Sequence, residues 1–226
     1  MAKIQFGMMM TDARGKLGGQ VFSKNRAGSY VRTKKTPSNP RTLDQQANRS
    51  LLGSTSRGWS HLTTDQRILW NEAVINWQRK NVFGATHIPS GKSLYVQLNK
   101  VLLANGASMI DVPPAKIDIP VFGLKSSLIT IGDGTLSLGY GGDATGFNIQ
   151  LRATPMLTAG TSNAKNRFRI IGYFNGASYS ATDGYDAYVA KFGVPTAGAN
   201  IQIEVSLVAE SGQISVPEKV TAGVTA

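Results

Sequence analysis

Asp111-Val112-Pro113-Pro114-Ala115 divides the sequence, because the spacing of apolar residues is helical before this stretch and alternating after it. Two consecutive prolines favour a stiff, extended connection. We therefore expect an α+β protein in three parts: a basic, glycine-rich arm with a short hairpin at 1–41, a small helical domain at 42–110, and an all-β domain at 111–226.

The first expected helix begins at Thr42-Leu43-Asp44-Gln45, which matches the capping box, in which the threonine and glutamine side chains each bond a free amide. Leu43, Ala47 and Leu51 then recur on one helical face. We expect Gly53 and Gly58 to end or weaken this helix.

Two more helices are expected before Asp111. Thr63-Thr64-Asp65-Gln66 is a second capping box, and an apolar stripe from Leu69 to Trp77 follows it. A third helix is expected from Ser90 to Asn105-Gly106, where glycine is typical of a helix end. These segments predict a small, basic three-helix unit.

The region after Asp111 has the period-two pattern of β-strands, with turn residues between the strands. The expected strands are 127–131, 135–140, 146–152, 167–173, 186–191, 200–208 and 213–224. Short strands at this spacing predict an immunoglobulin-like or fibronectin-type sandwich.

The first 41 residues contain too few apolar side chains for a core of their own. Gln20-Val21-Phe22-Ser23 and Ser29-Tyr30-Val31-Arg32-Thr33 predict a hairpin, with Lys24-Asn25-Arg26-Ala27-Gly28 as its loop. Two interpretations stay open: the arm gains order by lying on another molecule, or the hairpin packs on the rest of its own chain.

The net charge of +11 is concentrated in the first half of the chain. Residues 1–41 hold 9 Lys and Arg against 1 Asp, or +8; residues 42–110 hold 7 against 3, or +4; residues 111–226 hold 8 against 9, or −1. This asymmetry indicates contact with a polyanion or an acidic protein surface.

The basic arm therefore supplies the candidate docking residues, which are Lys24, Arg26, Tyr30, Arg32, Lys34, Lys35 and Arg41. Cations could bind phosphates and Tyr30 could stack on a base, but no base-reading element accompanies them. Basic arms also bind acidic protein surfaces, and a solvated positive loop is the third interpretation. We expect a protein partner, with nucleic acid less favoured.

Patterns that would indicate an enzyme, cofactor or metal site are weak. There is no cysteine, and His61 and His87 lack metal-ligand spacing. Gly91-Lys92-Ser93 lacks the glycine and strand that a phosphate-binding loop needs before it, Gly139-Tyr140-Gly141-Gly142 opens no helix, and Asp183-Gly184-Tyr185-Asp186 lacks calcium-loop spacing. We expect no enzyme, no cofactor and no metal, and no apolar run has the ~20 residues of a membrane span.

The order of these parts resembles a protein family carried by tailed bacteriophages and prophages. The resemblance lies in the glycine-rich basic stretch 15–32, in Asn39-Pro40-Arg41-Thr42 followed by Gln45-Gln46 and Arg49, and in the segment 62–71 after Trp59. Ser90-Gly91-Lys92-Ser93-Leu94-Tyr95 matches a later step of the same pattern. The resemblance covers about the first 106 residues.

The resemblance implies a virion structural protein, made in the host cytoplasm, without an activity to carry over. Capsid decoration is the use that we expect, with the major capsid protein or another virion protein as partner, and with the chain in a homo-oligomer or symmetric array. A neck, portal-vertex or tail protein is the first alternative, and a DNA-binding protein the second.

Overall fold

The computed structural model describes residues 2–3, 7–8, 10, 12–25, 28–80, 86–158, 160–161 and 164–226. The chain forms two compact units, Met1–Gln46 and Ala47–Ala226, which are treated separately below. The predicted boundary between 110 and 111 falls inside the second unit, so a division there stays a prediction.

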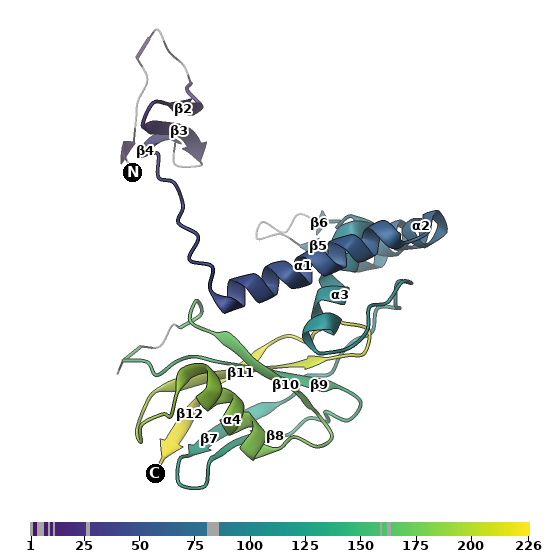
Figure 1. Ribbon diagram of the computed structural model, residues 1–226, viewed down its shortest axis with the longest axis vertical. Coiled ribbons are helices and arrows are strands. Elements are labelled where there is room, and N and C mark those ends of the chain that lie inside the picture. Colours follow the sequence, from purple (N-terminus) through teal and green to yellow (C-terminus); the bar gives the residue numbers. More distant parts are fainter. Residues whose placement is uncertain are drawn as a thin grey trace. The chain divides into compact units, whose positions relative to one another are not determined.

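The first unit is a four-stranded antiparallel sheet in the order β1-β4-β3-β2 (Figure 1). Its strands are β1 (Ala2–Lys3), β2 (Gly15–Leu17), β3 (Gln20–Asn25) and β4 (Gly28–Thr33). The predicted hairpin is confirmed as β3 and β4, and its pairing continues to Asn25 opposite Gly28, further than predicted. Strand β2 was not predicted; it turns into β3 at Gly18, whose φ of +56° favours glycine.

The helices of the second unit are α1 (Leu43–His61, which begins in the first unit), α2 (Thr64–Ala73), the 3-10 helix η1 (Val74–Trp77) and α3 (Gly91–Ala104). The capping box at Thr63 is confirmed, since Thr63 Oγ1 accepts from the Gln66 amide and Gln66 Oε1 accepts from the Thr63 amide. Ser90 caps α3 by accepting from the Ser93 amide. A short pair of strands, β5 (Arg79–Lys80) and β6 (Thr86–His87), lies between η1 and α3.

Gly53 and Gly58 were expected to end or weaken the helix; that they end it is wrong, because α1 continues through both residues to His61, and a weakening effect stays a prediction. Gly58 lies against α3, where a Cβ would be only 2.6 Å from Tyr95 Oη. Packing against α3 therefore accounts for a glycine whose intrinsic helix propensity is low.

The helical core centres on Tyr95, whose ring lies edge-on between two tryptophans. The ring centroids are 5.5 Å from Trp59 and 5.3 Å from Trp70. Trp70 is fully buried and donates from Nε1 to the Asp111 carbonyl at 2.8 Å. This bond holds the segment that follows α3 against the helical core.

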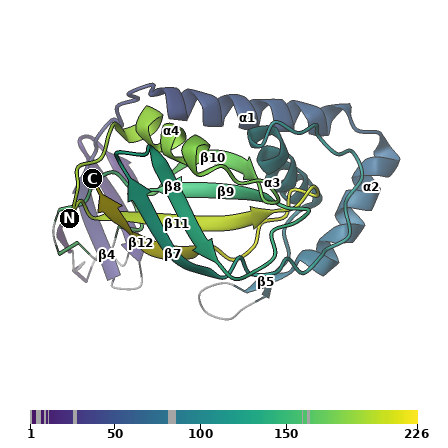
Figure 2. The same cartoon turned by 90° about the horizontal axis from the view of Figure 1, so that it is seen from below.

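The rest of the second unit is a six-stranded sheet in the order β10-β9-β11-β12-β7-β8. Its strands are β7 (Leu124–Thr130), β8 (Thr135–Tyr140), β9 (Asn148–Ala153), β10 (Arg169–Asn175), β11 (Ile201–Val208) and β12 (Glu218–Thr225). All pairs are antiparallel except β12 with β7. Helix α4 (Ala181–Phe192) lies over one face of the sheet (Figure 2).

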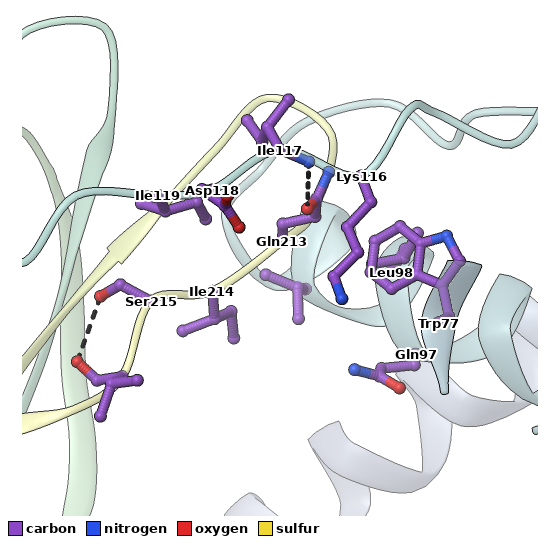
Figure 3. Close-up of a pocket in the computed structure, with 13 residues that line it drawn as sticks. Trp77, Gln97, Leu98, Lys116, Ile117, Asp118, Ile119, Gln213, Ile214 and Ser215 are labelled. Carbon is purple, nitrogen blue, oxygen red and sulfur yellow. Dashed lines mark hydrogen bonds between the residues drawn. The ribbon is translucent and has the colours of Figure 1, made fainter. Parts of the chain in front are cut away.

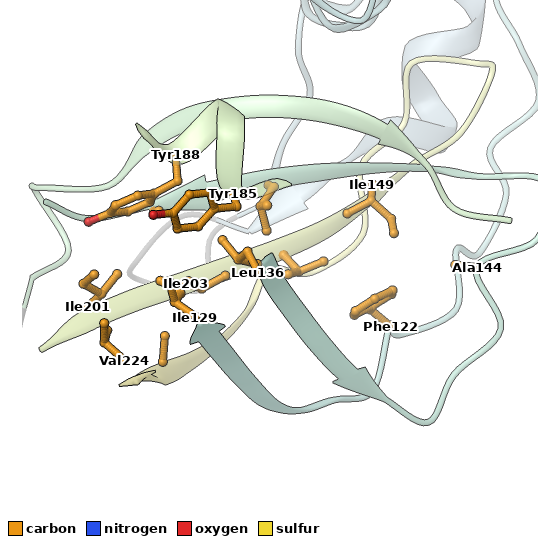
Figure 4. Packing of buried hydrophobic residues seen from close by; sticks show 14 of the residues in the cluster. Phe122, Ile129, Leu136, Ala144, Ile149, Tyr185, Tyr188, Ile201, Ile203 and Val224 are labelled. Carbon is orange, nitrogen blue, oxygen red and sulfur yellow. The ribbon is translucent and has the colours of Figure 1, made fainter. Parts of the chain in front are cut away.

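The sheet curls around α4, because the helix contacts both edge strands, β8 and β10. Tyr185 and Tyr188 of α4 face Ile129, Leu136 and Ile203 of the sheet (Figure 4). Burial of this apolar cluster is the main stabilising contribution to the unit.

The strand predicted at 186–191 is wrong, because these residues lie in α4. Tyr185, Tyr188 and Phe192 have the i, i+3, i+7 spacing of one helical face, and Ser180 caps the helix by accepting from the Asp183 amide. The α+β class is confirmed, whereas the immunoglobulin-like sandwich is not: the described strands after residue 111, β7 to β12, form one curled sheet closed by a helix.

Candidate docking surface

The pairing register assigns the side chains of the N-terminal sheet to two faces. Side chains alternate along a strand, and directly opposed residues share a face. Phe22 opposes Val31, and Leu17 opposes Gln20, two residues before Phe22. We call this side the apolar face after Leu17, Phe22 and Val31; Gln20, Ser29 and Thr33 share it, and Lys24 lies at its margin.

The opposite side is the basic face, composed of Lys16, Val21, Tyr30, Arg32 and Lys34. Val21 of β3 is opposed by Lys16 of β2 and by Arg32 of β4, so two cations flank one valine. The Lys34 amide donates to the Gly19 carbonyl at 2.7 Å, which continues the pairing of β4 for one residue. Lys34 therefore lies on the same face as Arg32.

The structure separates the predicted docking residues. Tyr30, Arg32 and Lys34 share the basic face, whereas Lys24 is on the apolar face. Lys35 and Arg41 lie in the exposed stretch before α1, and Arg26 lies outside the described residues. The docking role of these residues stays a prediction. The structure adds Lys16 to the basic face, because β2 pairs it with Val21. Lys16 was not among the predicted docking residues, since strand β2 was not predicted.

No side chain that the structure describes in residues 1–46 is buried. Leu17 is 72% exposed, and Phe22 and Val31 are only half-buried. A sheet normally covers at least one face with a second layer. Within the described part of its own unit, the N-terminal sheet therefore has an apolar surface without a core beneath it.

The cations of this unit are also largely uncompensated. Arg14 pairs with Asp12 at 3.4 Å. Within the described part of the unit, Lys16, Lys24, Arg32, Lys34 and Lys35 make no ion pair. Exposed cations without nearby carboxylates produce a positive potential that attracts acidic partners.

A hollow of about 350 Å³ lies in the second unit, between α3 and the extended segments 116–119 and 212–216 (Figure 3). Trp77, Leu98 and Ile214 form apolar walls, and the Lys116 side chain points into it. Gln213 lines the hollow, and its side-chain amide has a structural role. Its Oε1 accepts from the Ile117 amide at 3.1 Å, and its Nε2 donates to the Ala115 carbonyl at 2.8 Å. These contacts join the loop before β12 to the segment after α3.

The strongest pKa shifts belong to Tyr188, which is buried in the β-core, and to Tyr179, which is partly buried against it. Burial raises the pKa of Tyr188 to about 12, and its hydroxyl donates to the Thr154 carbonyl. Burial also raises the pKa of Tyr179, whose hydroxyl donates to the Leu136 carbonyl. These bonds to main-chain carbonyls give both hydroxyls a structural role.

Several of the weak sequence motifs considered above as sites lie in helices or at a helix end. Gly91-Lys92-Ser93 is the first turn of α3, and Asp183-Gly184-Tyr185-Asp186 lies in α4. His61 ends α1 and is exposed. In the described parts of the chain, no three His, Cys, Asp or Glu side chains come together as metal ligands.

The described helices include none with the length and apolar character needed to cross a bilayer. Comparisons with protein-family models, curated proteins and solved structures find no match to this chain.

Proposed function

We propose that this chain is a non-enzymatic structural protein of a bacteriophage virion that decorates the capsid shell. Its basic N-terminal half docks on the shell, and the curled sheet of the second unit is displayed outward. The partner is the major capsid protein or another virion protein, bound in a symmetric array.

The observation that carries this proposal is the absence of any buried side chain in the described residues of 1–46. Four paired strands have fixed the backbone of these residues, which costs roughly 1–2 kcal/mol per residue in conformational entropy. Without a core, little in the unit itself offsets that cost. A surface that covers the sheet would supply the missing apolar burial.

The second unit supports the other half of the proposal. Its β-core buries Ile129, Leu136, Ile149 and Ile203 completely, beneath α4. Residues 111–226 are close to neutral, at −1. This part of the chain has its own core and lacks the charge of the arm, as a displayed module would.

Deletion of residues 2–36 tests the proposal. The truncated chain should fail to bind capsids that take up the full chain, because both faces of the N-terminal sheet are lost. A circular dichroism spectrum with the helical signal of the full chain is the control for folding. Unchanged capsid binding by a folded truncation would refute the proposal.

A neck, portal-vertex or tail protein is the second candidate, and the edges of the N-terminal sheet favour it. Strands β1 and β2 end the sheet, and their outer edges pair with no described strand. Such edges can accept a strand from a neighbouring protein, as in an arm that clasps a ring. Quantitative mass spectrometry of purified particles distinguishes the two: hundreds of copies per virion indicate the shell, and about a dozen or fewer indicate a ring.

A further inference from the structure

The two faces of the N-terminal sheet fit different partners, which allows the partner's chemistry to be inferred. The inference rests on the proposed function, because it concerns the same docking surface. Nucleic acid would attract the basic face through its phosphates. A protein surface with an apolar patch would instead cover the apolar face.

The apolar face carries three apolar side chains that are exposed or half-buried, whereas the basic face carries two half-buried ones, Val21 and Tyr30. Leu17 is 72% exposed, and Phe22 and Val31 lie side by side across β3 and β4. Gly15 is the residue opposite Phe22 on β2, so no side chain covers the ring on that side. Burial of such side chains is favourable in proportion to the apolar area removed from water.

The basic face is costly to bury. Lys16, Arg32 and Lys34 would each lose hydration, and each would require a matching carboxylate. Left in water, the same cations attract an acidic partner over a distance and speed its association. The physical costs therefore assign burial to the apolar face and long-range attraction to the basic face.

We propose that the apolar face of the N-terminal sheet seats on an apolar patch of an acidic virion protein, with Lys24 pairing to a carboxylate at its margin. The basic face stays in solvent and steers the association. A second copy of this sheet is disfavoured as partner, because residues 1–41 carry +8 and would repel each other.

Photo-crosslinking in the full chain tests the proposal. Val21 and Phe22 are neighbours in β3, are both half-buried, and lie on opposite faces. The photoreactive residue p-benzoylphenylalanine replaces one or the other, and the chain is bound to particles and irradiated. We expect position 22 to crosslink to another virion protein at least about ten-fold more than position 21.

Each other outcome of the crosslinking contradicts a defined part of the proposal. Crosslinks to DNA from position 21 would identify a nucleic-acid partner. Crosslinks from position 22 to the same chain would show that the sheet packs on its own second unit. Equal crosslinking to a virion protein would overturn only the assignment of the face, whereas failure of the full chain to associate with particles would overturn the proposed function itself.

Binding kinetics give a second readout on chains that carry no photoreactive group. On particles that lack this protein, Phe22→Ser should dissociate about ten-fold faster than the unmodified chain, and Val21→Ser should dissociate at the unmodified rate. Lys16→Gln with Arg32→Gln should slow association and weaken its salt dependence, without faster dissociation. Faster dissociation of Val21→Ser than of Phe22→Ser would overturn the proposal.

Discussion

Gly212 lies where the loop before β12 packs against the backbone of α3. Its φ is +78°, and a Cβ at this position would be 2.5 Å from the Leu98 carbonyl oxygen. Gly212→Ala therefore combines left-handed strain of about 1–2 kcal/mol with a backbone clash. We expect it to lower the free energy of unfolding, measured by urea denaturation, by about 3 kcal/mol or more.

Gly198→Ala is the matched control for this prediction. Gly198 has a φ of +77°, but a Cβ there would meet nothing within 4 Å. It should lower the free energy of unfolding by the strain alone, about 1–2 kcal/mol. Equal losses in the two variants would show that the loop yields around Gly212 and that the close approach to α3 contributes nothing.

The sequence does not predict the role of a residue that depends on contact with a distant element. Asn99 is fully buried; it donates to the Tyr95 and Ile110 carbonyls and accepts from the Ile110 amide at 2.7 Å. A lone asparagine in a helix has no pattern that reveals these bonds, because Ile110 lies beyond the end of the helix. Gly58 and Gly212 were equally hidden, since each depends on a contact with a different element.

The capping box at Thr63 stabilises a single element, helix α2. Thr63→Ala would remove the hydroxyl that accepts from the Gln66 amide at 3.2 Å. Loss of an N-cap of this type costs about 1 kcal/mol. We expect the midpoint of urea denaturation to fall accordingly, and Thr64→Ala, one residue into the exposed face of α2, to leave the midpoint nearly unchanged. Similar shifts in both variants would contradict a capping role for Thr63.

Elements were predicted well where their signals are local. The capping box at Thr63 and the helix start expected at Ser90 located α2 and α3, and alternation located the six strands of the large sheet. Helix α4 was missed because 187–190 is a short apolar run, which alone does not distinguish a buried strand from a helix, and the helical spacing appears only over the wider 181–192. The order of the strands could not be predicted, because the parallel pair β7 and β12 joins residues nearly a hundred positions apart.

The candidate docking surface also could be predicted only in part, because the sequence does not show on which face of the sheet each residue lies. The basic residues were identified from charge alone, without their positions on strands. Their division into faces depends on the register of β2, β3 and β4. Lys24 and Arg32 therefore looked equivalent in the sequence, although they lie on opposite sides of the sheet.

At the scale of the whole molecule, the exposed stretch from Lys34 to Arg41 connects the N-terminal sheet to α1, the helix in which the first unit ends and the second begins. It contains Pro37 and Pro40 and forms no helix or strand. Trypsin cleaves after lysine and arginine and requires an extended, accessible backbone. We expect its first cuts after Lys35 or Arg41, which leave a product that begins at Thr36 or Thr42, identified by mass spectrometry.

This product should keep the thermal transition of the intact chain, because both apolar cores, around Tyr95 and beneath α4, lie entirely within 47–226. The removed sheet has no described buried side chain with which to stabilise them. A transition lowered by more than a few degrees would mean that the sheet packs on the second unit. In that case its apolar face is already covered within the chain, and the docking surface must be sought elsewhere.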